Sequence, residues 1–169
     1  MTTTEKKTEM TNYYTGVGSR STPAEVLLLM TAFSKKSMVD GWVLRSGAAK
    51  GADTAFEEGA GLAKEIFIPW KSFSKDPDHI LVGEYPEAEK LAAAAHPAWH
   101  RCSPAAKLLH TRNACQVLGY NLKTPSKFLL CWAPPTKDGV EGGTNTAWQI
   151  AKQHNIRCFN LALDKDRQR

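Results

Sequence analysis

Hydrophobic and polar positions along the chain follow two alternating periods, one typical of strands and the other of helices. Short apolar runs of strand length occur in five places, and the segments between them carry apolar residues three and four positions apart. The runs are "YYTGV" (13–17), "WVLRSG" (42–47), "EIFIPW" (65–70), "KFLLCWAP" (127–134) and "RCFNLAL" (157–163). The helical patterns cover 23–41, 52–64, 86–96, 104–119 and 144–155.

Strands that alternate with helices are typical of an α/β protein. We therefore predict a Rossmann-like, doubly wound fold, with a mainly parallel sheet and helices on both faces. A single domain is expected over 12–163, with tails at 1–11, expected to be disordered, and at 164–169. Residues 71–103 are rich in Pro, Lys and acidic residues. We interpret them as an insertion over the sheet edge or the mouth of the ligand site.

Right-handed crossovers place every strand-to-helix loop of such a sheet at its carboxyl edge, where ligands bind. Three loops of this kind are rich in small residues: "GVGSRSTP" (16–23), "SGAAKGAD" (46–53) and "EGGTNTA" (141–147). Each offers backbone amides at the start of a helix, an arrangement that favours anions. Three such loops on one edge are more specific than any one of them.

The first loop is not a dinucleotide fingerprint. The third glycine of GxGxxG would fall at Ser21, and the second strand carries Arg45 where an acidic residue would hold a ribose. The sequence also lacks the Gly-Lys-Ser/Thr of a Walker A loop. Arg20 nevertheless adds a planar donor fork suited to phosphate or carboxylate. The alternative is a tight turn with a surface arginine.

Several candidate side chains have a structural alternative. Lys50 suits a phosphate contact but equally suits a solvated loop, and Asp53 suits either a ligand contact or a helix cap. Trp70 and Trp132 each end a strand at the ligand edge and are candidate stacking platforms for a base. Their alternative role is packing in the core or at its rim.

Composition adds a modest bias toward anionic partners. The net charge is +5 and the pI about 9.0, which fits a nucleotide or nucleic acid without demanding one. The four cysteines form no CxxC pair, and no apolar run has the length of a membrane helix. The N-terminus also lacks the apolar segment of a signal peptide. We therefore expect a cytoplasmic location and no membrane partner.

The stretch "HPAWHRC" (96–102) raises the possibility of zinc, because His96 and His100 lie four apart with Cys102 near. Pro97 disturbs the local helix and no fourth ligand is evident in the sequence. We therefore predict no metal and no cofactor.

The order of "GVGSR", "SGAAKGADTAFEEGA", a helical "RN" and "GGTNTA" resembles the SMF/DprA–LOG (SLOG) superfamily of Rossmann-like domains, over about residues 13 to 162. The resemblance implies a nucleotide-related or nucleic-acid ligand and self-association into homo-oligomers. Carried onto this chain, it implies that the ligand is bound by Gly18, Ser19, Arg20, Ser46, Gly47, Lys50, Asp53, Arg112, Asn113, Gly142, Gly143, Thr144 and Asn145.

One departure from the family bears on catalysis. LOG enzymes, which cleave nucleoside monophosphates, carry a catalytic glutamate in a PGGxGTxxE motif. Aligning Gly143 and Thr144 with its Gly-Thr puts Ala147 at the glutamate position, and alanine cannot handle protons. We therefore expect no catalytic residues.

The leading hypothesis is non-catalytic binding, for sensing or sequestration, of a nucleotide-derived phosphate ligand such as a cyclic oligonucleotide or an ADP-ribose-type signal. Single-stranded DNA binding of the DprA type is the alternative. A LOG-type N-glycosidase is the second alternative, disfavoured by Ala147.

Overall fold

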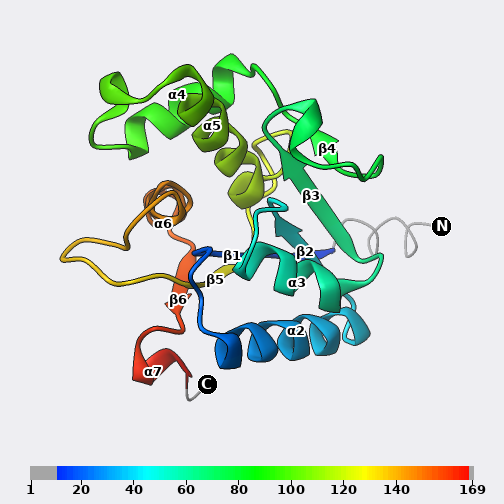
Figure 1. The fold of residues 1–169 in the computed structure, drawn as a ribbon. Helices are drawn as coiled ribbons and strands as arrows, with labels where there is room; N and C mark the ends of the chain where they lie inside the picture. Colours follow the sequence, from blue (N-terminus) through cyan, green and yellow to red (C-terminus); the bar gives the residue numbers. More distant parts are fainter. Residues whose placement is uncertain (1–10, 168–169) are drawn as a thin grey trace.

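The computed structural model describes residues 11–167, so the expected N-terminal tail lies outside the described residues except for Thr11. Six parallel strands form one sheet in the order β4-β3-β2-β1-β5-β6 (Figure 1). The strands are β1 (Asn12–Gly18), β2 (Trp42–Ser46), β3 (Lys64–Ile68), β4 (Ile80–Leu81), β5 (Phe128–Trp132) and β6 (Arg157–Asn160).

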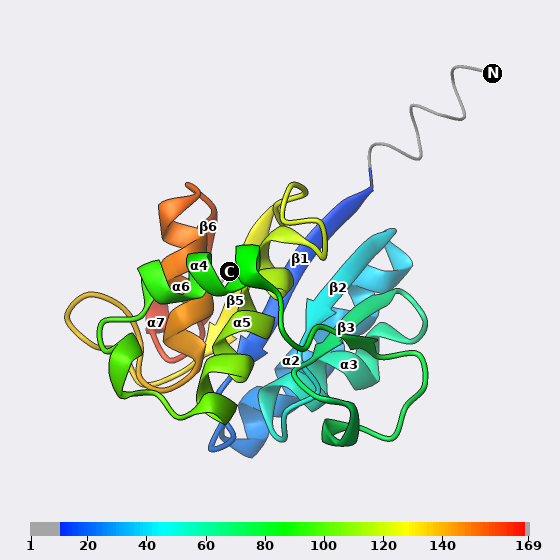
Figure 2. The ribbon, with the colours of Figure 1, turned by 90° about the horizontal axis from the view of Figure 1, so that it is seen from above.

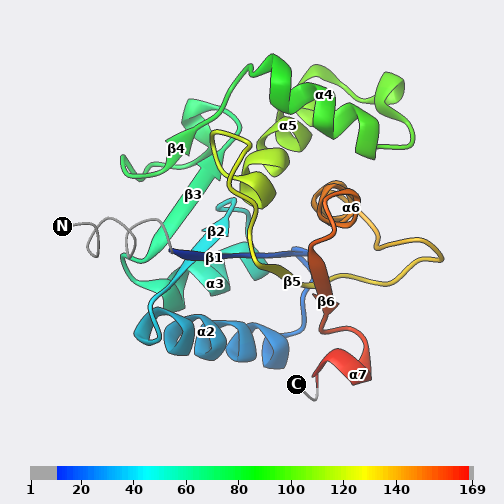
Figure 3. The same ribbon diagram turned by 180° about the vertical axis from the view of Figure 1, so that it is seen from behind.

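Helices cover both faces of the sheet. The main helices are α2 (Ala24–Val39), α3 (Ala52–Ala60), α4 (Pro86–Ala95), α5 (Pro104–Leu118) and α6 (Thr144–Gln153). One layer contains α2 and α3, and the other contains α4, α5 and α6, as the views from the front and from behind agree (Figures 1 and 3). Viewed from above, α4, α5 and α6 lie over the sheet (Figure 2). The predicted Rossmann-like fold is confirmed.

The alternation of side chains along each strand supplies both layers with a core. Tyr14 of β1 and Leu130 of β5 pack with α2 and α3, whereas Val17 and Leu129 of the same strands pack with α5 and α6. Because neighbouring residues of a strand face opposite sides, the wholly apolar sequence of β5 fits a strand that is buried on both faces.

Strand β1 marks the switch point of the topology. It pairs with β2 on one side and with β5 on the other, and after β4 the chain crosses to β5 through α4 and α5 on the second face. The order in which strands are added therefore reverses between β1 and β5, and the carboxyl ends of these two strands border the crevice where ligands of such folds bind.

Two short elements differ from the sequence expectations. Strand β4 lies within 71–103, the segment interpreted from the sequence as an insertion over the sheet edge or the mouth of the ligand site, and it extends the sheet beyond β3. Asp164–Arg167 forms helix α7 where a tail was expected. The carboxylate of Asp166 accepts the backbone N–H of Asn160 at 2.8 Å, which fixes this segment to the end of β6. No helix among residues 11–167 is long and apolar enough to cross a bilayer.

Candidate functional site

A cavity of about 770 Å³ opens at the carboxyl edge of the sheet. Its walls come from the loop after β1, the start of α3, the inner face of α5, the segment between α4 and α5, and the loop before α6. The lining residues are Val17, Gly18, Ser19, Arg20, Ala49, Asp53, Phe73, His96, Pro97, Leu109, His110, Arg112, Asn113, Gln116, Val140, Glu141, Gly142, Gly143, Thr144, Asn145, Thr146 and Ala147.

The loop after β1 is held against β5. The backbone N–H of Ser19 donates to the carbonyl of Trp132 at 2.9 Å. A Cβ added at Gly18 would lie 2.8 Å from that same carbonyl oxygen, so the approach of the two strands requires glycine. The loop is therefore fixed by its backbone and by hydrogen bonds of its own hydroxyl groups, since the Ser19 hydroxyl accepts the backbone N–H of Ser21 at 3.0 Å and the Thr22 hydroxyl donates to the carbonyl of Ser19 at 2.6 Å.

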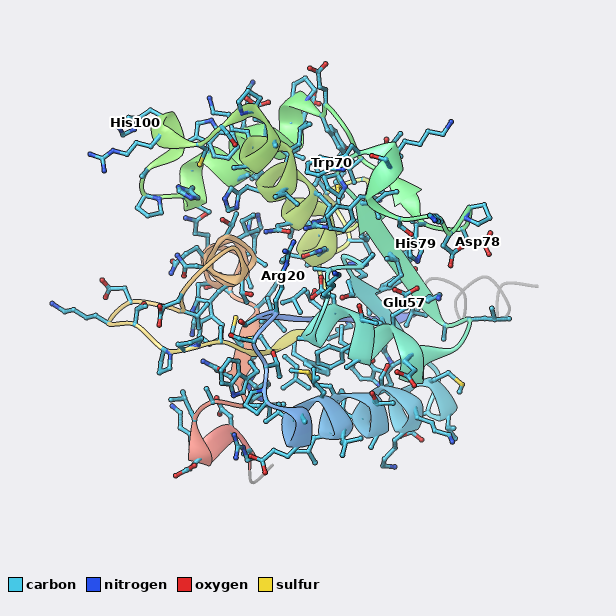
Figure 4. The ribbon with its side chains drawn as sticks, in the orientation of Figure 1. Arg20, Glu57, Trp70, Asp78, His79 and His100 are labelled. Atoms are coloured by element: carbon cyan, nitrogen blue, oxygen red, sulfur yellow. The ribbon has the colours of Figure 1, made fainter. Side chains whose placement is uncertain are left out.

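Arg20 is the exposed cation of this loop. Its guanidinium has no hydrogen-bond or ion-pair partner within residues 11–167, although it lines the cavity. Figure 4 shows Arg20 over the end of β1, between α3, α5 and α6. A guanidinium in this position can bind an anion without breaking an existing contact.

The loop before α3 packs directly beneath the first loop. Gly51 has a φ of 89°, and a Cβ there would lie 2.7 Å from the carbonyl oxygen of Ser19. Any other residue would meet both strain and a backbone clash. The backbone N–H of Ala52 donates to the same Ser19 carbonyl at 3.4 Å. The two glycine-containing loops thus form one rigid unit.

Asp53 lies in the first turn of α3 and is buried, with 4% of its surface exposed. Its carboxylate accepts the backbone N–H of Ala49 at 3.3 Å. Burial raises the pKa of Asp53 from 3.8 to about 6, and the Arg112 guanidinium and nearby backbone amides only partly oppose this rise. A carboxyl with this pKa changes its charge near neutral pH, beside the cavity.

Arg112 ties the ends of two strands to helix α5. Its Nη1 donates to the carbonyl of Gly47 at 2.7 Å, directly after β2, and to that of Phe67 at 3.1 Å in β3. Its Nε donates to Oδ1 of Asn113 at 2.9 Å. Burial lowers the pKa of Arg112 to about 10, so the guanidinium stays charged at neutral pH. Although Arg112 lines the cavity, much of its donor capacity is used within the fold.

Asn113 extends this network to the third loop. Its Nδ2 donates to the carbonyl of Gly143 at 3.1 Å. Asn145 then fixes the loop before α6 from within, because its Oδ1 accepts the backbone N–H of Val140 at 3.2 Å. Positions where a Cβ would stand at Gly142 and Gly143 have no heavy atom within 4 Å. The backbone at the start of α6 is therefore open to the cavity.

Two histidines that the sequence analysis did not assign to the ligand site line the opposite wall. The rings of His96 and His110 have centroids 4.6 Å apart, and Nδ1 of His110 lies 2.7 Å from Oγ1 of Thr146. Burial, followed by the charges of His96 and Arg112, lowers the pKa of His110 to about 4, so this imidazole is neutral at physiological pH. His110 and Asn113 lie three residues apart on one helix face, and that spacing was the available signal.

The structure gathers ten of the predicted ligand residues around the cavity. They are Gly18, Ser19, Arg20, Asp53, Arg112, Asn113, Gly142, Gly143, Thr144 and Asn145. Three predicted residues of the second loop lie outside its lining. Ser46 is buried and donates to the carbonyl of Gly16 at 2.6 Å, Gly47 lies against Arg112, and Lys50 is exposed.

The two tryptophans considered for base stacking also lie outside the lining. Trp70 is partly buried and contacts the ring of Phe73 edge-on, with centroids 5.6 Å apart. Trp132 is partly buried against the core beside α2 and α3. Phe73 is the aromatic residue that lines the cavity, and its ring lies 5.4 Å from the Arg112 guanidinium.

Comparison with known proteins supports the fold rather than a function. No protein-family model and no curated protein matches the sequence. Among solved structures, the chain is similar to DNA processing protein A from Helicobacter pylori, described for its unique single-stranded DNA binding mode. The TM-score is 0.61 at 13% identity, over 92% of this chain and 67% of that one.

The chain is also similar to the Moco carrier protein of Chlamydomonas rheinhardtii, with a TM-score of 0.50 at 17% identity, over 94% of this chain and 80% of that one. At such identities the likeness establishes the architecture alone. The chain therefore has a DprA-like, Rossmann-like fold, and the chemistry of its site must be argued from its own residues.

Proposed function

We propose that this protein binds a phosphorylated, nucleotide-type ligand in the cavity at the carboxyl edge of its sheet, and that it binds this ligand without transforming it. The observation that carries the proposal is the meeting of three strand-to-helix loops around one cavity with an unpaired guanidinium, that of Arg20. The cavity has a volume of about 770 Å³, which lies within the range of roughly 300–1,000 Å³ that small-molecule sites occupy.

The phosphate would bind between Arg20 and the start of α6. This helix has ten residues, and its dipole favours an anion at its start. The N–H groups of Asn145 and Thr146 already donate to the carbonyls of Gly142 and Gly143, so a phosphate would approach the N–H groups of Gly143 and Thr144. Gly142 and Gly143 allow a phosphate to approach the backbone closely, since no side chain covers them. Thr144 adds a hydroxyl on the same wall.

The remaining walls suit the less polar part of a nucleotide. Val17, Phe73, Pro97 and Leu109 supply apolar surface, while the buried amide of Gln116 is held by Gly47 and Arg112 at the edge of the cavity. Ligand sites commonly combine apolar walls with a few fixed polar groups. A base and sugar held there would place the phosphate toward Arg20.

The residue at the base of the third loop, Ala147, favours binding without cleavage. Ala147, at the position of the glutamate in the LOG-type motif, is 1% exposed within the core packing of α6. The carboxyl groups that do line the cavity are Asp53, engaged by the backbone amide of Ala49, and the exposed Glu141. We therefore propose sensing or sequestration, with a cyclic oligonucleotide or an ADP-ribose-type signal as the ligand class.

Single-stranded DNA binding is the second candidate, favoured by the fold shared with the Helicobacter pylori protein and by the net charge of +5. In that case the cavity would hold one nucleotide of a longer strand. Self-association with a second copy, which the family resemblance implies, is supported by exposed apolar residues on α2, where Leu28 and Val39 are each 73% exposed.

Replacing Arg20 with alanine tests the proposed anion site. Loss of one charge-assisted hydrogen-bonding group is expected to weaken binding of a nucleotide by about tenfold or more, as measured by isothermal titration calorimetry against mononucleotides, cyclic nucleotides and short DNA. Lys36→Ala, which removes one exposed charge from α2, is the control and should leave the affinity unchanged. Equal affinities for wild type and Arg20→Ala would exclude the site.

The same titrations at several salt concentrations separate the two candidates. A ligand confined to the cavity gives a shallow dependence of log K on log salt, whereas single-stranded DNA gives a slope of about −0.7 for each phosphate contacted. A slope of log K against log salt that corresponds to several phosphates would favour single-stranded DNA binding over binding of a small nucleotide ligand. Chromatography of the nucleotides after incubation should return them intact.

Gly143→Ala tests whether the ligand approaches the backbone at α6. Gly143 has φ −62° and ψ −25° and open space around its Cβ position, so alanine should change the free energy of unfolding by less than about 0.5 kcal/mol. The added methyl group would occupy the space proposed for the phosphate, and affinity should fall at least several-fold. Unchanged affinity together with unchanged stability would place the ligand elsewhere.

The charge of Asp53 predicts a pH dependence. Because the carboxyl has a pKa of about 6 when folded and 3.8 as its reference value, the fold binds its proton more tightly than the unfolded chain. The free energy of unfolding should therefore fall by up to about 3 kcal/mol as pH rises from about 4 to 6.5. Asp53→Asn should remove this component in denaturant titrations.

The affinity for a ligand should also depend on the protonation of Asp53. A cyclic nucleotide keeps a single phosphodiester charge over this pH range, so its own titration does not interfere. Its affinity for the wild type should increase as pH falls from 7.5 to 5, because protonation of Asp53 removes a nearby negative charge. An equally steep increase in Asp53→Asn would show that another group is responsible.

A further inference from the structure

Three side chains with metal-binding atoms converge at the wall of the cavity formed by the end of α4, the segment 96–103 and α5. His96, Cys102 and His110 each offer one ligand atom, and these atoms all lie within 4.8 Å of one another. The first two are close in sequence, but His110 comes from the middle of α5. The third ligand was therefore not evident from the sequence, which had suggested His100 instead.

We propose that His96, Cys102 and His110 bind a zinc ion, or a similar transition-metal dication, beside the ligand cavity. Imidazole nitrogen and thiolate sulfur are both ligands that zinc accepts, and both also suit copper. Three protein ligands leave one tetrahedral position for water or for an oxygen of a bound ligand. Because His96 and His110 both line the cavity, this fourth position would be open to it.

The distances support this assignment. Sγ of Cys102 lies 3.7 Å from Nε2 of His96. A tetrahedral ion with bonds of about 2.3 Å to sulfur and 2.05 Å to nitrogen separates these two ligands by about 3.6 Å and two nitrogens by about 3.3 Å. One pair therefore already has the required spacing. The third ligand atom lies within 4.8 Å of the other two, so it must move closer by at most about 1.5 Å.

The surroundings of His110 suit a metal ligand. Its Nδ1 lies 2.7 Å from Oγ1 of Thr146 on α6. When Nδ1 donates its proton to this hydroxyl, Nε2 keeps its lone pair for a metal, and the hydrogen bond fixes the orientation of the ring. Thr146 is buried, with 2% of its surface exposed, so this partner is held firmly in place.

His96 must change its hydrogen bonding when the ion binds. In the described structure, Ala98 N–H donates to Nδ1 at 3.0 Å. Coordination through Nε2 requires Nδ1 to carry the proton, so the peptide at Ala98 must turn away. The thiol proton of Cys102 leaves to solvent as its sulfur becomes a thiolate. The contacts of Cys102 are long, at 3.7 and 3.8 Å, and are thus weak competitors.

A second group of potential metal ligands is already engaged in short hydrogen bonds and ion pairs. This group consists of Glu57, Asp76 and His79. Glu57 and His79 lie away from Arg20 (Figure 4). Glu57 already forms short contacts, 2.8 Å to Lys64 Nζ and 2.7 Å to His79 Nε2, and Nδ1 of His79 lies 2.6 Å from the Ser74 hydroxyl. A cation there would have to displace a lysine and break short hydrogen bonds.

The test titrates metal-free protein with cobalt(II) alone and measures the metal content of protein purified with zinc. The expected result is roughly one equivalent per chain and, with cobalt, visible bands of a tetrahedral ion with a near-ultraviolet thiolate charge-transfer band. Cys102→Ser should abolish the charge-transfer band, and both it and His110→Ala should weaken binding by about tenfold or more. His100→Ala, an exposed neighbour in the same segment, should bind as the wild type does.

The wild-type cobalt spectrum alone can overturn the proposal, whatever the variants do. A protein that binds no stoichiometric cobalt, or binds it without a thiolate band, has no such site. Equal affinity in Cys102→Ser would show that other groups hold the ion. No nucleotide is present in these titrations, so their failure leaves the proposed nucleotide function untouched, and the reverse also holds.

Discussion

The site depends on the hydrogen bonds that the buried guanidinium of Arg112 forms with the ends of two strands. The guanidinium donates to the carbonyls of Gly47 and Phe67, which lie at the ends of neighbouring parallel strands, and so joins the sheet to α5. A buried charge is stable only when its hydrogen bonds are satisfied. Asn113 beside it carries the same network to the carbonyl of Gly143. One helix thereby fixes the second and third loops relative to each other.

The two arginines of the cavity differ in burial and in hydrogen bonding. Arg112 is 5% exposed, and its N–H groups donate to Asn113 and to the carbonyl of Gly47. Arg20, by contrast, is exposed, and its guanidinium has no partner within residues 11–167. Glycine contacts between the loops hold the backbone, as at Gly51 against Ser19. A rigid site with one uncommitted cation loses little entropy on binding an anion.

The sequence predicted much of the fold because hydrophobic periodicity and loop chemistry are local signals. It placed the parallel strands, the two helix layers and the loops around Arg20 and Gly143. It could not show that Ser46 turns into the sheet, since a hydroxyl at the end of a strand can face either way. Nor could it bring His110 to His96, because this pairing depends on how α4 packs on α5. The short strand β4 lacked any period long enough to detect.

The central proposal is that an anionic nucleotide binds over the three loops. Amide NMR spectra of the ¹⁵N-labelled protein, recorded during titration with mononucleotides and cyclic nucleotides, test it most directly. We expect the largest shifts on the amides of Gly18 to Arg20 and of Gly142 to Asn145. Shifts confined to α2 or to β4, or no shifts with any nucleotide, would contradict it.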